Sequence, residues 1–230
     1  MKLLDRLGLR CRRGEDGYQD ASLIEVVVAK TAALTGRIDD VVPGEALLPT
    51  IAGLAAAGTS EPLRIIDFGG AAGLHYRLAK QVFPARAYRW AVIETAQMVG
   101  AAAKFENEEL RFFTSLDAGT DWLGCVDVMH CVSALQYVPE PEQTLAELVG
   151  LRAHTMVWAK LMLGDRYEKF QQTSQLRDNG PGPLHENVRD RKVVYTATRF
   201  PKADFMSAHL RAGYRLAWKA DSSSSFIFLA

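Results

Sequence analysis

From residue 62 onward, short apolar runs alternate with longer segments whose apolar residues lie three or four positions apart. The runs are typical of strands and the longer segments of helices. Because strands and helices alternate, the pattern predicts a parallel sheet with helices on both faces. We expect strands at 63–68, 88–94, 110–114, 125–131, 154–161, 214–220 and 225–230, and helices at 73–83, 96–105, 140–151 and 201–212.

The last two expected strands depart from this alternation. Only Asp221 and four serines separate 214–220 from the apolar run Phe226 to Leu229. A helix does not fit in so short a link, so the two strands should pair antiparallel. The predicted fold is an α/β, Rossmann-like sheet of seven strands, mostly parallel, with a C-terminal antiparallel hairpin.

The first 58 residues are predicted to be helical. Ser22 and Glu25 have the spacing of a capping box, in which each side chain binds a free amide of the first turn. Apolar residues then recur at helical spacing, and 45–57 is a second helical segment rich in alanine and leucine. We therefore divide the chain into a helical extension or lid at 1–58 and a main domain at 59–230.

The segment 165–195 follows neither pattern. Its stretch from Asp178 to Pro183 alternates glycine and proline, which interrupt helices and strands. A long irregular segment in a compact domain is usually functional or disordered. We interpret it as a lid over a ligand, with His185 and Asn187 as candidate substrate contacts, and disorder is the competing interpretation.

Composition narrows the classes of function. The chain has 230 residues, 48% of them hydrophobic, and no net charge, which suits one compact domain. The main basic cluster, Arg10 with Arg12 and Arg13, fits a solvated face, so no nucleic acid is expected as a partner. The three cysteines, Cys11 among them, are too far apart for a disulfide framework or a zinc pattern, and no metal is expected.

The chain also lacks a secretory signal and any long uninterrupted apolar stretch. We therefore expect a cytoplasmic protein that does not enter a membrane. The sequence leaves open whether the protein forms a homodimer.

A glycine-rich turn follows the strand expected at 63–68. Asp67 precedes Gly69, Gly70 and Gly73, and the next strand ends in Glu94. Glycines let the backbone turn and approach a ligand closely, and an acid about twenty residues later can accept hydrogen bonds from a ribose. A carboxylate before the turn can bind an ammonium group, which S-adenosylmethionine has. The alternative is that the first acid caps a helix and the second is a solvated strand end.

These features resemble the class I S-adenosylmethionine-dependent methyltransferases, with the strand 126–130 and the terminal hairpin as further matching parts. The resemblance implies S-adenosylmethionine as the cofactor. It places Asp67 and the three glycines at the methionine moiety and Glu94 at the ribose.

A narrower resemblance is to uncharacterised proteins of this kind that are found with bacterial surface-polysaccharide genes. The similar sequence segments are 66–70, 75–76, 133–137 and 195–201. This resemblance implies little about the acceptor.

Four further residues are candidate cofactor contacts. His75 and Tyr76 follow the glycine turn, and Ser115 follows the third strand. Met98 lies one helical turn past Glu94, where it either packs on an adenine or is simple core.

The chemistry expected of such a site is the displacement of a methyl group, which requires alignment and a base if the acceptor is a hydroxyl. His130 ends the fourth strand and is the best-placed histidine, either as this base or as a buried strand residue. Gln136 and Tyr137 follow it in a loop that should face the acceptor. Packing of Tyr137 under Pro139 is the alternative for that ring.

The sequence thus favours O-methylation of a small molecule or glycan. One alternative is an NAD(P)-dependent short-chain oxidoreductase, because Tyr76 and Lys80 match its Tyr-x-x-x-Lys pair, although directly after the glycine turn. The other is a binding module that retains the fold without catalysis.

Overall fold

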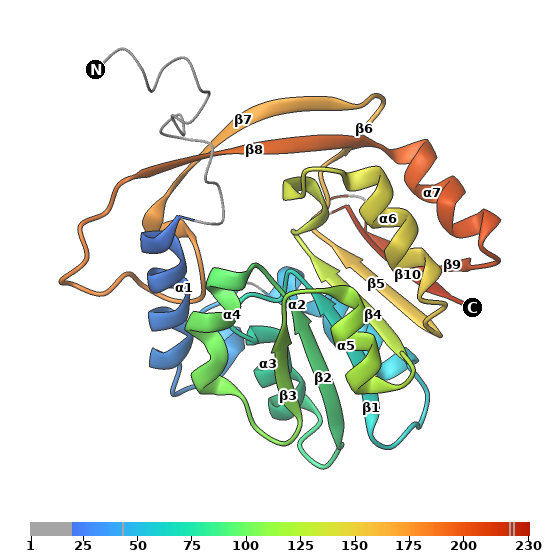
Figure 1. Ribbon diagram of the computed structural model, residues 1–230, viewed down its shortest axis with the longest axis horizontal. Helices are drawn as coiled ribbons and strands as arrows, with labels where there is room; N and C mark the ends of the chain where they lie inside the picture. The colour runs from blue at the N-terminus through green and yellow to red at the C-terminus, as the bar shows by residue number, and fades with distance from the viewer. Residues whose placement is uncertain (1–19, 43, 221, 223) are drawn as a thin grey trace.

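The computed structural model describes residues 20–42, 44–220, 222 and 224–230. Its central sheet has seven strands in the order β3-β2-β1-β4-β5-β10-β9 (Figure 1). The first five strands in this order are parallel, whereas β10 is antiparallel to both β5 and β9. The predicted fold class is therefore confirmed. The strands are β1 (Leu63–Phe68), β2 (Tyr88–Ile93), β3 (Leu110–Phe113), β4 (Val128–Val132), β5 (Thr155–Ala159), β9 (Arg215–Ala220) and β10 (Ser225–Leu229).

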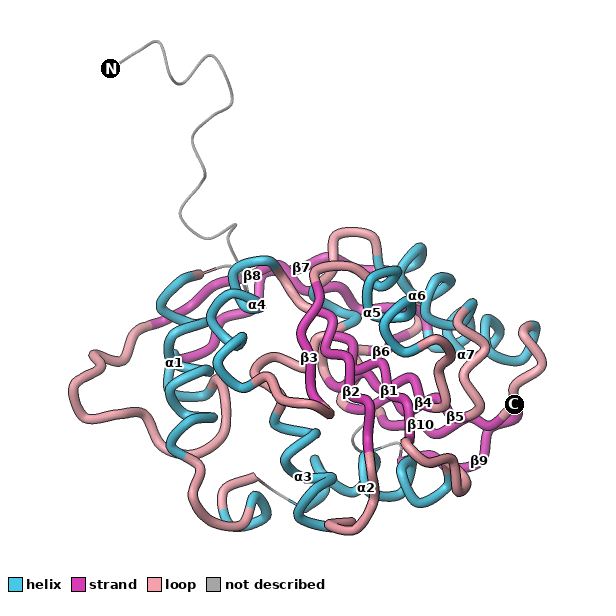
Figure 2. Tube along the Cα trace, turned by 60° about the horizontal axis from the view of Figure 1, so that its bottom comes forward, coloured by secondary structure: helices cyan, strands magenta, loops and turns pink. Residues whose placement is uncertain are grey.

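Helices cover both faces of this sheet, and Figure 2 shows the strands between the two helical layers. One apolar cluster joins the sheet to α1, α2, α3 and α4, and two others join it to α5, α6 and α7. The sequence analysis missed α5, a short helix with a glycine inside it. The helices are α1 (Ala21–Ala33), α2 (Gly44–Ala56), α3 (Leu74–Val82), α4 (Ala96–Ala102), α5 (Leu116–Leu123), α6 (Pro141–Gly150) and α7 (Lys202–Arg211), with short 3-10 helices η3 (Ile38–Asp40), η4 (Ala103–Phe105), η5 (Leu135–Tyr137) and η6 (Leu176–Asp178).

The carboxyl ends of the parallel strands meet at one edge. In the register of the sheet, Phe68 of β1 lies opposite Ile93 of β2 and Cys131 of β4. The glycine turn follows β1, Glu94 follows β2 and Ser133 follows β4. Ligands of open α/β sheets bind at such an edge.

The N-terminal cap of α1 differs from the predicted one. The carboxylate Oδ1 of Asp20 accepts hydrogen bonds from the backbone N–H groups of Ser22 at 2.9 Å and Leu23 at 3.3 Å. The predicted capping box of Ser22 and Glu25 is therefore wrong, because an aspartate two positions earlier satisfies the free amides. The cluster of Arg10, Arg12 and Arg13, with Cys11, lies outside the described residues.

The segment expected to be irregular is largely strand. A second sheet contains β6 (Leu163–Gly164), β7 (Glu168–Gln175) and β8 (Lys192–Pro201), with β7 and β8 antiparallel. Figure 1 shows these two strands as a long arm that passes over the main sheet toward α1. Within this segment, 165–167 and 179–191 are irregular. The prediction failed because β7 is mostly polar, with one half-buried face.

The described part of the chain contains no helix with both the length and the apolar character needed to cross a bilayer.

Candidate functional site

A cavity of about 440 Å³, which we call the Gly69 cavity, lies at the carboxyl ends of β1, β2 and β4. Gly69, Glu94 and Ser133, which follow these strands, line it. Leu23 and Val27 of α1 line it from the N-terminal region. Apart from the carboxylate and a few hydroxyls, its walls are mainly apolar side chains. The space therefore suits a ligand with a flat apolar part and a few polar groups.

The glycine turn is shaped by close contacts. Gly69 has a φ of +69°, and a Cβ at this residue would lie 2.2 Å from the Cβ of Ala134. A Cβ at Gly70 would lie 2.4 Å from Oδ2 of Asp67. Since real side chains do not approach so closely, only glycine fits at both positions. Gly73 precedes α3 as its N-terminal cap residue.

Glu94 connects the turn to the end of β2. Its Oε1 accepts a hydrogen bond from the N–H of Ala71 at 3.1 Å, and its Oε2 accepts one from the N–H of Thr95 at 2.9 Å. Burial raises the pKa of this carboxyl, and the two backbone hydrogen bonds only partly offset that effect. Each carboxylate oxygen keeps a further lone pair, so Glu94 can accept hydrogen bonds from a ligand in the Gly69 cavity.

Asp67 does not line the Gly69 cavity. Its side chain is fully buried, where Oδ1 accepts from Nδ1 of His130 at 2.7 Å and Oδ2 accepts from Nε1 of Trp90 at 3.0 Å. Burial alone would raise the pKa of Asp67, but the charge and hydrogen bond of His130, with smaller contributions from His75 and Trp90, lower it. A direct contact of Asp67 with a ligand, expected from the sequence, does not fit this geometry.

His130 is also fully buried. Its Nε2 lies 2.8 Å from Oγ1 of Thr50 in α2, so both ring nitrogens have hydrogen-bond partners. Nδ1 donates to Asp67 when it carries a proton, and Nε2 accepts from the Thr50 hydroxyl in the neutral ring or donates to it in the charged ring. A base must reach the acceptor, and His130 lines neither the Gly69 cavity nor the larger cavity beside it that is described below. This placement does not fit the role of general base and agrees with the alternative, a buried strand residue.

His75 is half-buried at the start of α3, and its ring packs edge-on against His130 with centroids 4.7 Å apart. Within the described residues, its Nδ1 is buried without a hydrogen-bond partner. Burial, together with the charges of His130 and Lys160, lowers the pKa of His75 to about 4, although Asp67 opposes the shift. His75 is therefore neutral near pH 7.

Asp67, His75 and His130 form a cluster, with His75 half-buried and the other two fully buried, whose possible ligand atoms lie within 4.8 Å of one another. Such a donor set is chemically able to bind a transition metal. In this structure the carboxylate and one imidazole are hydrogen-bonded directly to each other, and an ion would have to separate them.

Of the remaining expected cofactor contacts, only Met98 lines the Gly69 cavity. Tyr76 donates its hydroxyl to Glu109 at 2.9 Å, at the opposite end of the sheet. Ser115 is exposed and caps α5 by accepting from the N–H of Ala118 at 3.3 Å. Its neighbour Thr114 lines the cavity instead.

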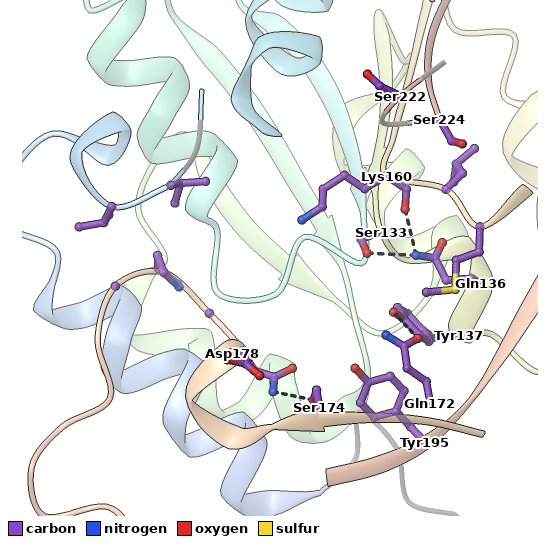
Figure 3. A pocket seen from close by; sticks show the side chains of 18 residues that line it. Ser133, Gln136, Tyr137, Lys160, Gln172, Ser174, Asp178, Tyr195, Ser222 and Ser224 are labelled. Atoms are coloured by element: carbon purple, nitrogen blue, oxygen red, sulfur yellow. Dashed lines mark hydrogen bonds between the residues drawn. The ribbon is translucent and has the colours of Figure 1, made fainter. Parts of the chain in front are cut away.

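A second and larger cavity has a volume of about 880 Å³, and we call it the Lys160 cavity. Figure 3 shows the side chains that line it. Ser133 and Tyr137 line both cavities, so the two are adjacent. Gln136 and Lys160 also line the larger one, whereas His185 is exposed and lines neither. Strands β7 and β8 and the loop that starts after η6 provide the opposite wall.

Sequence reasoning missed Ser133 and Lys160 as individual site residues. Both directly follow strands, β4 and β5, and both have a positive φ, 56° and 55°. The prediction extended the fifth strand through Lys160, and this placed it inside the sheet. A shorter strand would have put it at the ligand-binding edge.

No family model and no curated protein sequence matches the chain. Solved structures do match it. CcbJ, a methyltransferase from Streptomyces caelestis, aligns over 92% of this chain and 99% of its own, with a TM-score of 0.56 and 13% identity. CalS10 from Micromonospora echinaspora, an amino pentose methyltransferase solved with S-adenosylmethionine bound, aligns over 87% and 94%, with a TM-score of 0.53 and 15% identity.

The sugar N-methyltransferase KedS8 from Streptoalloteichus is similar over 81% of this chain and 87% of its own, with a TM-score of 0.53 and 13% identity. At such low identity the shared property is the arrangement of strands and helices. The chain therefore has the Rossmann-like fold of these methyltransferases.

Proposed function

We propose that this protein is an S-adenosylmethionine-dependent methyltransferase that acts on a hydroxyl of a small molecule or glycan. The observation that carries the proposal is the Gly69 cavity, where a glycine turn and Glu94 meet at the carboxyl ends of β1 and β2. Its mainly apolar walls and single carboxylate fit a nucleoside. The shared fold agrees with this proposal.

The roles of the lining residues follow from their positions. Glu94 accepts hydrogen bonds from ribose hydroxyls through its free lone pairs, and Met98 packs against the base. Leu23 and Val27 of α1 keep water away from that side of the cavity. Bound S-adenosylmethionine would supply a methyl group on a positively charged sulfur.

The roles of two residues change from those expected. Asp67 and His130 act in this proposal as positioning residues, because Asp67 packs beneath Gly70 and His130 links Asp67 to Thr50. Gln136 and Tyr137 remain proposed acceptor contacts, since both line the Lys160 cavity.

The oxidoreductase alternative depends on Tyr76 and Lys80 as a catalytic pair. Both bind Glu109, the tyrosine through its hydroxyl at 2.9 Å and the lysine through an ion pair at 3.1 Å. Neither lines the Gly69 cavity. This arrangement favours a structural role for the pair.

A thermal-shift measurement separates these functions. S-adenosylhomocysteine should raise the unfolding temperature of the purified chain, because a ligand that binds only the folded state stabilises it. NAD and NADP should not. Stabilisation by a nicotinamide cofactor alone would refute the proposal, and binding of S-adenosylhomocysteine without methyl transfer to any of a panel of hydroxylated acceptors would favour the binding module.

A further inference from the structure

Hydrogen bonds hold together the residues that follow β4 and β5. We call the group of Ser133, Gln136 and Lys160 the platform. Ser133 and Lys160 follow these neighbouring strands with φ values of 56° and 55°, a region that residues with a Cβ rarely adopt. The amide nitrogen of Gln136 donates to Oγ of Ser133 at 3.0 Å and to the carbonyl of Lys160 at 3.1 Å. The N–H of Lys160 donates to Oγ of Ser225 at 3.3 Å. Strained residues held in this way cluster at binding sites.

This platform holds a positive charge in the Lys160 cavity. Lys160 is exposed, and its ammonium group has no ion pair or hydrogen bond within the described residues. Figure 3 shows its side chain extending away from Gln136 into the space between the walls. Among the cavity-lining residues that the structure describes, Lys160 is the only cation. The ammonium is therefore available to a ligand.

The rest of the cavity offers hydroxyl and amide groups beside a smaller set of apolar side chains, namely Val41, Val42, Leu161, Met162 and Pro181. Gln172 and Ser174 come from β7 and Tyr195 from β8, and Ser222 and Ser224 lie near the turn between β9 and β10. Such groups bind polyhydroxylated molecules by multiple hydrogen bonds. The one carboxylate among the described lining residues, Asp178, already accepts from the N–H of Gln175 at 3.0 Å.

We propose that the acceptor is a sugar-like molecule that carries a carboxylate or phosphate group, and that Lys160 pairs with this anion. The inference rests on the proposed function, because the Lys160 cavity is the acceptor site only if the Gly69 cavity holds the methyl donor. Ser133 and Tyr137, which line both cavities, lie where acceptor and donor would meet.

The test compares three sugars that differ only at C6: D-glucose, D-glucuronate and D-glucose 6-phosphate. Their affinities for the full chain are measured by ligand-observed NMR with and without S-adenosylhomocysteine. At least one acidic sugar should bind about tenfold more tightly than glucose, and the stronger of the two identifies carboxylate or phosphate as the preferred group. This preference should weaken as ionic strength rises, because exposed charges are screened.

Lys160→Met should reduce the affinity for the acidic sugar to that for glucose and leave the affinity for S-adenosylhomocysteine unchanged. Lys160→Arg should retain the preference. Lys169→Met removes another lysine, one on β7 that does not line the cavity, and should change nothing.

Equal affinity for the three sugars, or no detectable binding of either acid at high concentration, would overturn the inference. A loss of S-adenosylhomocysteine affinity in Lys160→Met would also overturn it, because the ammonium would then pair with the carboxylate of the cofactor. If the wild type does not bind S-adenosylhomocysteine at all, the proposed function itself fails. The sugar titrations performed without S-adenosylhomocysteine then still measure the preference of the cavity for an acidic sugar.

Discussion

At the scale of single residues, a buried chain of hydrogen bonds runs from Thr50 through His130 to Asp67 and Trp90. The sequence suggested that the acid and the histidine would face a ligand, because both lie at strand ends. Sequence alone does not show that Trp90 and Thr50 are present to bind them. Glu94 and Gly69 line the Gly69 cavity, since a strand end and a glycine turn suffice to locate them at this edge, and their contact with a cofactor stays a prediction.

Removal of the Thr50 hydroxyl tests this chain of hydrogen bonds. Thr50→Val leaves Nε2 of His130 buried without a partner and should lower the free energy of unfolding by about 1–3 kcal/mol. Thr31→Val is the matched control, because the Thr31 hydroxyl only binds the Val27 carbonyl within its own helix, and its cost should be smaller. Urea denaturation measures both, and an equal or smaller cost for Thr50→Val would contradict the role given to His130.

At the scale of elements, the strands of the main sheet could be predicted because their apolar runs are strong and bounded by turns. The helix α5 could not, since it is short and contains Gly119. The arm of β7 and β8 was missed because its strands pair mainly with each other, and polar residues dominate β7. Helix α2 was found from its composition, but its packing against β5 depends on one glycine.

Substitution of that glycine separates helix propensity from packing. A Cβ at Gly53 of α2 would lie 2.1 Å from Cγ2 of Val157, so Gly53→Ala should destabilise the protein by about 1–3 kcal/mol. At Gly100 of α4 no atom beyond the neighbouring backbone of its own helix lies within 4 Å of a Cβ, so Gly100→Ala should stabilise the protein by about 0.5–1 kcal/mol. The unfolding temperatures of the two variants should therefore shift in opposite directions from that of the wild type. A higher unfolding temperature for Gly53→Ala would show that α2 is not packed as described.

At the scale of the whole molecule, buried histidines link stability to pH. Burial lowers the pKa of His209 in α7 to about 4, and only the carbonyl of Phe205 opposes this shift. Between the unfolded pKa of about 6.5 and this value, the unfolded chain binds a proton that the folded chain does not. Stability should therefore fall as the pH is lowered through this window, and His75 adds a loss of the same sign.

The variant His209→Phe retains an aromatic ring at the position that stacks on Phe228 and removes the titrating group. Between pH 6.5 and pH 5 its loss of stability should be smaller than that of the wild type by on the order of 2 kcal/mol. The free energy of unfolding is measured by urea denaturation at each pH. An equal loss between pH 6.5 and pH 5 in wild type and His209→Phe would refute this assignment.

The claim that the Gly69 cavity binds the methyl donor is tested most directly by calorimetric titration of S-adenosylhomocysteine into the wild type and Glu94→Gln. Loss of hydrogen bonds to a charged acceptor should weaken binding by about 10- to 100-fold. Glu109→Gln, at the far end of the sheet, should bind like the wild type. A wild type that releases no heat of binding, or a Glu94→Gln variant with unchanged affinity, would contradict the account.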